Sequence, residues 1–89
     1  MQITEIKIRK LLDTGRLRAV VSVTFDGVFA VHDIKVGQGD DRLFIAMPSR
    51  RESDGTYRDV VHPINAQFRS MTENAVLDEY RSAVGEKSS

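Results

Sequence analysis

Two adjacent arginines, Arg50 and Arg51, are the residues best suited to chemistry with a charged ligand. They follow an apolar run and Pro48, which cannot donate to a strand ladder and so predicts the end of a strand. A guanidinium group pairs bidentately with phosphate oxygens, so two of them at a rigid strand end predict a phosphate-binding loop. The same residues would also serve simply to solvate a loop, and their types alone leave both interpretations open.

Further arginines could enlarge this cationic surface. Arg58 lies on a predicted strand shortly after the first pair, and Arg16 and Arg18 stand at the start of an earlier strand. Tyr57 offers an aromatic face on which splayed nucleic-acid bases could stack, whereas Phe44 is expected in the core. This pattern does not by itself favour nucleic acid over an acidic protein partner.

The residues for catalysis or metal binding are few. The chain has two histidines and no cysteine, and no serine lies in a turn typical of a catalytic nucleophile. His32 is in phase with apolar strand positions, which predicts a hydrogen-bonded structural histidine, and His62 precedes Pro63, where it would fix a turn. Asp40 and Asp41 lack the further ligands of a calcium loop. We therefore expect no enzyme activity, no metal and no cofactor.

Composition limits the classes of partner. The 89 residues include 13 Lys and Arg and 13 Asp and Glu, so the formal net charge is zero and nucleic-acid binding would require a local patch. The absence of cysteine fits a reducing compartment. The N-terminus lacks signal-peptide features, and no apolar run approaches the ~20 residues that span a bilayer. We expect a cytoplasmic protein without membrane contact.

The elements that must position these residues follow from hydrophobic periodicity. Alternating apolar residues predict strands, and an apolar stripe at helical spacing predicts one C-terminal helix. Asp26-Gly27 predicts a tight hairpin turn, Asn65 a helix N-cap, and Gly85 the helix end. The expected strands are 3–11, 17–25, 28–36, 43–47 and 57–61, and the expected helix is 65–84.

These elements predict an α+β fold with a mainly antiparallel sheet of about five strands and one helix. We expect a single domain over residues 1–84 and a disordered tail at 85–89. One helix can cover only one face of a sheet. Val20, Phe29 and Val31 would then lie on the other face and leave apolar surface for a partner.

Several collinear motifs also resemble the bacterial SpoVG family, whose members are called stage V sporulation protein G or septation proteins. The string Leu-Phe-Ile-Ala-Met-Pro-Ser-Arg-Arg at 43–51 carries the strongest resemblance. Asp-Gly-Thr-Tyr-Arg-Asp at 54–59 and His-Pro-Ile-Asn at 62–65 add to it. Further matching segments are 3–6, 15–19, 31–34 and 76–80, so the resemblance covers nearly the whole chain to about residue 81.

The resemblance implies a curved antiparallel sheet with a C-terminal helix, dimerising through strands. It also implies a site-preferring DNA-binding protein that binds RNA and acts as a regulator in sporulation, septation or wider gene control. The basic pair that the family uses falls on Arg50 and Arg51, and the helix, which is thought to influence sequence preference, adds Arg69 and Arg81. Glu52-Ser53 replaces the Thr-Pro of many relatives, so we expect a more acidic and less stiff loop.

Two classes of function therefore follow from the sequence. In the first, a homodimer places two basic loops against the phosphates of DNA or RNA. In the second, the chain is a protein-interaction module that uses an exposed sheet face or edge and does not touch nucleic acid.

Overall fold

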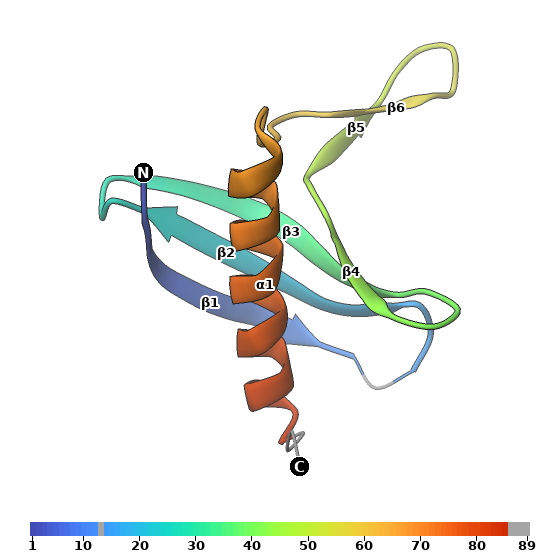
Figure 1. Cartoon of the computed structure of the whole chain (residues 1–89). Coiled ribbons are helices and arrows are strands. Elements are labelled where there is room, and N and C mark those ends of the chain that lie inside the picture. The colour runs from blue at the N-terminus through green and yellow to red at the C-terminus, as the bar shows by residue number, and fades with distance from the viewer. Residues whose placement is uncertain (13, 86–89) are drawn as a thin grey trace.

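The computed structural model describes residues 1–12 and 14–85. In these ranges an antiparallel sheet of order β1-β2-β3-β4 is accompanied by a separate β5–β6 hairpin and one helix, α1 (Figure 1). The predicted α+β class is confirmed, although the last predicted strand belongs to the hairpin and not to the main sheet. The elements are β1 (Ile3–Leu11), β2 (Leu17–Phe25), β3 (Phe29–Gln38), β4 (Leu43–Ala46), β5 (Ser49–Arg51), β6 (Tyr57–Asp59) and α1 (Ala66–Ala83).

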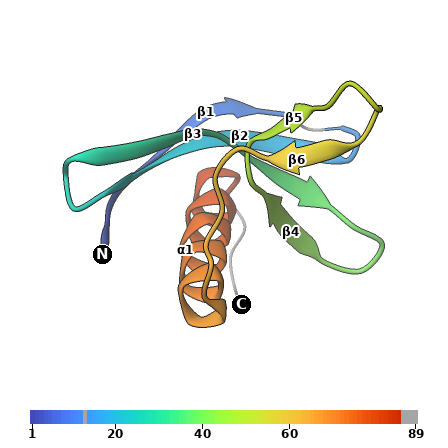
Figure 2. The same ribbon diagram turned by 90° about the horizontal axis from the view of Figure 1, so that it is seen from above.

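The core lies between one face of the four-stranded sheet and α1, which crosses that face (Figure 2). The alternation predicted for β2 is confirmed, because Val21 and Val23 are fully buried against the helix side. Val76 supplies a fully buried side chain from α1. Core residues from the sheet and helix are Ala19, Val21, Val23, Phe25, Ile34, Val36, Ile45, Met47, Val76, Leu77 and Tyr80.

Both predicted ends of the helix agree with the structure. The Asn65 side chain accepts a 2.7 Å hydrogen bond from the Phe68 N–H, so it caps the first turn as expected. Gly85 follows α1 with a φ of 76°, the left-handed conformation in which glycine commonly ends a helix. Residues 86–89 of the predicted disordered tail lie outside the described residues.

The pairing of β2 with β3 contains a β-bulge at Asp33. Val21 pairs with Ile34 and Val23 with Val31, so two residue steps along β2 match three along β3. Asp33 has a φ of 66°, within the left-handed region that aspartate tolerates better than most residues. The extra residue reverses the side-chain phase of β3 on its N-terminal side.

This reversal corrects one prediction about the uncovered face of the sheet. Val31 packs against the core, and the Phe29 ring lies 6.5 Å from the Phe25 ring on the helix side. Phe29 and Val31 therefore do not join Val20 on the other face, and the predicted apolar outer surface is wrong. A single unbroken alternation along residues 28–36 could not have revealed the bulge.

Phe44 was expected in the core, but its side chain remains 38% exposed and covers a glycine. Gly37 and Phe44 are cross-strand partners, and a Cβ built on Gly37 would lie 2.6 Å from Phe44 Cζ. An aromatic ring laid over a strand glycine compensates for the missing side chain. This packing accounts for β3 continuing to Gln38, two residues beyond its predicted end.

Candidate nucleic-acid interface

The residues with the clearest binding chemistry lie on the β5–β6 hairpin, which projects from the body of the protein (Figure 1). These two strands pack only against one another among the secondary-structure elements. The Pro48 carbonyl accepts a 2.7 Å hydrogen bond from the Val60 N–H and closes the base of the hairpin. The interpretation of Arg50 and Arg51 as loop residues is therefore wrong, because the chain re-enters a strand directly after Pro48.

The tip of the hairpin is held by local hydrogen bonds. One carboxylate oxygen of Asp54 accepts from the Thr56 N–H at 3.0 Å and from the Thr56 hydroxyl at 2.7 Å. These hydrogen bonds lower the pKa of Asp54 below its ordinary value of 3.8. The Glu52 N–H donates to the Thr56 carbonyl at 2.7 Å, which closes the turn. The tip is thus a defined turn that carries an ionised carboxylate at neutral pH.

The register of the hairpin separates its three arginines onto two faces. Arg50 pairs with Arg58, and Arg51 pairs with Tyr57. Because successive side chains on a strand point to opposite faces, Arg50 and Arg51 cannot bind the same phosphate from one face of the hairpin. We call the two surfaces the Arg50/Arg58 face and the Arg51/Tyr57 face.

The hairpin arginines form no salt bridge within the described ranges 1–12 and 14–85. The salt bridges there involve Arg16 and Arg81, and no side-chain hydrogen bond reaches Arg50, Arg51 or Arg58. All three hairpin arginines are exposed. Like charges directly opposite on a β-ladder repel, so an anion between Arg50 and Arg58 would stabilise the pair.

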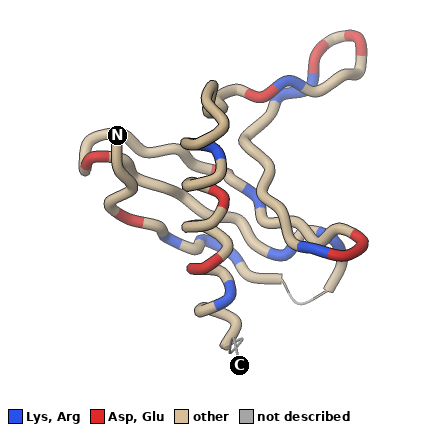
Figure 3. Tube along the Cα trace, viewed as in Figure 1, with Lys and Arg blue, Asp and Glu red and all other residues tan. Residues whose placement is uncertain are grey.

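The arginines of the β1–β2 connection are engaged elsewhere. Arg16 forms a 3.4 Å salt bridge with Asp40, in which both side chains are mostly exposed, so the pair adds little stability. Arg18 Nε donates to the Tyr80 hydroxyl at 3.4 Å and so links β2 to the end of α1. Figures 1 and 3 place this connection far from the hairpin, and the structure does not bring the predicted basic residues into one patch.

The two helix arginines lie near opposite ends of α1. Arg69 is exposed in the first turns, at the end of the helix that the hairpin connection enters. Arg81 lies in the last turn and forms a 3.7 Å salt bridge with Asp78. Arg69 is therefore the closer of the two to the hairpin along the chain, and the start of α1 is the end of the helix nearer to the hairpin in Figure 1.

Both histidines form hydrogen bonds, as their predicted structural roles require, but the bulge at Asp33 places His32 on the opposite face of β3 from the buried Ile34, so the predicted phase of His32 is wrong. His32 Nδ1 and Ser22 Oγ share a 2.8 Å hydrogen bond across β2 and β3. His62 Nδ1 donates to the Pro63 carbonyl at 3.1 Å in the connection to α1. In the described part of the chain, no group of three or more His, Asp or Glu side chains is arranged to hold a metal ion.

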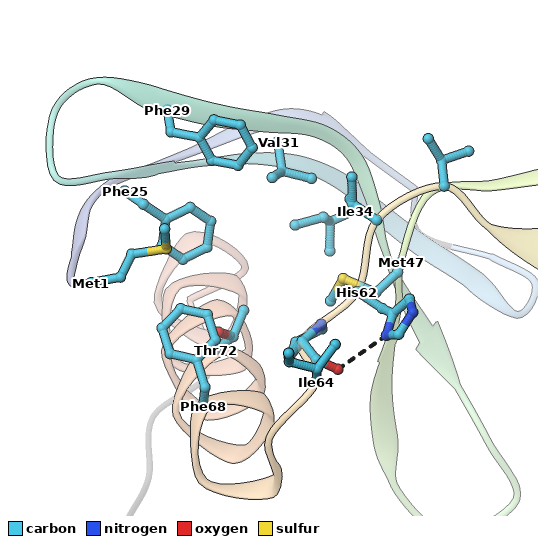
Figure 4. A pocket seen from close by; sticks show the side chains of 13 residues that line it. Met1, Phe25, Phe29, Val31, Ile34, Met47, His62, Ile64, Phe68 and Thr72 are labelled. Carbon is cyan, nitrogen blue, oxygen red and sulfur yellow. Dashed lines mark hydrogen bonds between the residues drawn. The ribbon is translucent and has the colours of Figure 1, made fainter.

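Sequence reasoning missed an apolar groove of about 530 Å³ beside the start of α1 (Figure 4). The groove lies between the helix, the β2–β3 hairpin and the connection 60–64. Phe29 and Ile64 line it, and Ile64 is 92% exposed. Thr72 also lines it, and the hydroxyl of Thr72 is buried without a hydrogen-bond partner in the described structure. The signal in the sequence was Ile64, directly before the N-cap, where an apolar residue ordinarily packs against an apolar fourth residue of the helix; here that fourth residue is Arg69.

Comparison with known proteins identifies the relatives of this fold. The SpoVG family model matches residues 1–82. Three similar proteins share the name "Putative septation protein SpoVG". The first, from Caldicellulosiruptor saccharolyticus, is 49% identical over 94% of this chain and 96% of its own. The protein of Caldanaerobacter subterraneus subsp. tengcongensis is 54% identical over 93% of this chain and 91% of its own. The protein of Acetivibrio thermocellus is 56% identical over 92% of this chain and 87% of its own. No helix within the described residues is long and apolar enough to cross a membrane.

Proposed function

The chain belongs to the SpoVG family, and from that membership and its exposed arginines we propose a DNA- and RNA-binding regulatory protein that acts as a homodimer. Its relatives carry septation in their names, so we place the regulated process in septation or sporulation. A chain without cysteine suits the cytoplasm, which is the compartment we assign.

One observation carries the proposal: three exposed arginines that form no salt bridge in the described structure share a small projecting hairpin. Arg9, Arg42 and Arg69 are exposed as well, but they come from three different segments of the fold, whereas the hairpin holds three arginines within residues 50–58. Phosphate is the anion that guanidinium groups bind with the best geometry.

A dimer reconciles phosphate binding with zero net charge. Two hairpins would present six arginines (Figure 3). Each hairpin also carries Glu52, Asp54 and Asp59, but Asp59 pairs with Ser49 on the Arg51/Tyr57 face, so the strands place no carboxylate on the Arg50/Arg58 face. Phosphate contacts fix position but carry no sequence information. We therefore expect modest sequence preference, with part of it arising from nucleic-acid shape.

The apolar groove is the surface we assign to the second copy of the chain. Ile64 and Phe29 both expose large apolar areas in the lining of this groove, and a protein of zero net charge does not repel its own copy. The other route, pairing of edge strands, is partly blocked at β4, because Glu73 accepts a 3.4 Å hydrogen bond from the Ile45 N–H. Strand pairing would then use the outer edge of β1.

The oligomeric state tests this part of the proposal. Sedimentation equilibrium should give a dimer for the native chain and a monomer for Ile64→Asp. The matched control is Val28→Asp, an equally exposed valine at the β2–β3 turn, which does not line the groove and should leave the dimer intact. A native monomer, or a dimer that persists in Ile64→Asp, would mean that the groove is not a dimer interface.

Nucleic-acid binding is tested by fluorescence anisotropy with labelled DNA and RNA at low salt. Arg50→Gln/Arg58→Gln should weaken binding to both, with circular dichroism confirming the native fold. Arg9→Gln/Arg42→Gln changes the charge equally at exposed sites outside the hairpin and should bind close to native. Equal losses in the two double variants would mean that only net charge matters, and the hairpin would not be the site.

The groove also favours a second candidate function, a protein-interaction module for another protein. In that case Ile64→Asp would abolish function, and Arg50→Gln/Arg58→Gln would leave it intact. The native protein would then bind neither DNA nor RNA, and this result would decide between the two candidates.

A further inference from the structure

The two faces of the β5–β6 hairpin differ in chemistry. The Arg50/Arg58 face carries two opposed guanidinium groups and no acidic cross-strand partner. The Arg51/Tyr57 face places a guanidinium plane directly opposite an aromatic ring. Directly opposed side chains have Cβ atoms about 5 Å apart, so the two planar groups are close enough to contact the same ligand.

Tyr57 has no packing role in the described structure. Its side chain is 68% exposed, and the ring pairs are Phe25 with Phe29 and Phe25 with Phe68. A large aromatic residue kept in solvent on a strand with a defined tip is a preformed surface. Its two side-chain torsions cost little entropy to hold during binding.

The face of an aromatic ring selects unpaired bases. In a duplex the base faces are stacked on one another, and only the base edges and the phosphates are accessible. In a single strand the bases can be splayed onto tyrosine and arginine planes, and every base offers such a face. A stacking surface without a groove-reading element therefore suits single strands better than duplexes.

We propose that the hairpin grips single-stranded nucleic acid, with phosphates on the Arg50/Arg58 face and an unpaired base stacked on the Arg51/Tyr57 face. Both faces are available because β5 and β6 pack only against one another. A strand can follow the edge of this narrow ribbon and present its phosphates to one face and a base to the other. This inference rests on the proposed nucleic-acid binding and assigns a new binding residue, Tyr57, and a substrate class to it.

The test compares three probes of one sequence: a single-stranded DNA, the matching single-stranded RNA and the duplex DNA. The native protein should bind the single strands more tightly than the duplex at equal salt. Tyr57→Ala should weaken single-strand binding roughly 5- to 140-fold, the range expected for loss of one stacked base. Duplex binding and the salt dependence should stay near native, because no charge is removed.

Tyr57→Phe is the matched control, because it keeps the ring and removes only the hydroxyl. It should bind single strands close to native, which separates stacking from a hydrogen bond of the phenol. The chain has no tryptophan and two tyrosines, of which Tyr80 is buried, so a stacked base can quench the fluorescence of Tyr57 and not that of Tyr80. Single strands should quench this emission more than the duplex does.

The outcomes distinguish a failure of single-strand binding at Tyr57 from a failure of nucleic-acid binding as a whole. Tighter binding of the duplex, or an unchanged ratio of single-strand to duplex affinity in Tyr57→Ala, overturns this inference while nucleic-acid binding stands. No binding of any probe overturns the proposed function itself. Equal effects on the DNA and RNA strands are expected for stacking, and a loss confined to RNA would point to a contact with the 2′-hydroxyl and against this arrangement.

Discussion

The β-bulge at Asp33 is a local feature with a global effect, and it can be tested by substitution. Asp33 has a φ of 66°, and this conformation lets Phe29 and Val31 face the helix. Valine is β-branched and enters the left-handed region at a cost of about 1–2 kcal/mol, so Asp33→Val should lower the free energy of unfolding by that amount. Glycine adopts the conformation freely but loses about 0.5–1 kcal/mol of entropy, so Asp33→Gly should stay near native.

Deleting Asp33 removes the bulge and not merely its preferred residue. Phe29 and Val31 would then turn away from the helix side, and His32 would turn towards it. Phe29 is half-buried and Val31 is more than half-buried, so together they forfeit roughly 2–4 kcal/mol at most, and burying an imidazole without a partner adds roughly 1–3 kcal/mol. A total of roughly 3–7 kcal/mol is a large share of the stability of a small domain, which is about 5–13 kcal/mol at this length.

Urea unfolding followed by circular dichroism measures these differences. The order of stability should be Asp33→Gly close to native, Asp33→Val lower, and the deletion lowest. For a domain of this size the valine variant should melt roughly 4–16 °C below native. If Asp33→Val were as stable as Asp33→Gly, the left-handed conformation of Asp33 would not be required. If the deletion left stability unchanged, the bulge would not be what turns Phe29 and Val31 towards the helix.

Three further perturbations follow from single contacts. Thr72→Val replaces with a methyl group a buried hydroxyl that lacks a hydrogen-bond partner in the described structure. The free energy of unfolding, measured by thermal unfolding, should rise by about 1 kcal/mol or more. A lower free energy of unfolding would mean that the hydroxyl has a hydrogen-bond partner. Asn65→Ala removes the cap on the Phe68 N–H and should cost about 1 kcal/mol in urea unfolding, whereas Asn65→Ser should restore most of it. The pKa of Asp54 is lowered in the folded hairpin, so its contribution to tip order is present above pH 3.8 and is lost as pH falls through the lowered pKa. NMR titration of the Thr56 amide should follow that protonation, and Thr56→Val should raise the pKa of Asp54 towards its ordinary value; an unchanged pKa would contradict the assigned cause.

The parts of the fold that were predictable depend on neighbouring residues. Asp26 and Gly27 have φ of 53° and 67°, as the expected tight turn between β2 and β3 requires. The alternation of β2 and the Asn65 cap are likewise properties of a few consecutive residues. Such signals act within one turn or one strand, so the chain alone reveals them.

The parts that were not predictable depend on which strand lies opposite. The bulge at Asp33 is visible only in the register of β3 against β2, and no local pattern marks it. The separation of Arg50 from Arg51 follows from the pairing of β5 with β6, whose three-residue length is too short to give a period. The types of residue in the sequence therefore indicated the candidate site. The division of that site into two faces depends on the register of β5 against β6, which the sequence does not reveal.

The salt dependence of DNA binding is the sharpest test of whether the hairpin arginines bind phosphates, because it counts phosphate contacts. With four to six contacts per dimer, the slope of log K against log salt concentration should be about −4 to −5 for the native protein on duplex DNA. Arg50→Gln/Arg58→Gln removes two arginines per chain and should flatten the slope by about 3 to 4, while Arg9→Gln/Arg42→Gln should leave it unchanged. A native slope near zero, or a slope unaffected by the hairpin substitutions, would contradict the account.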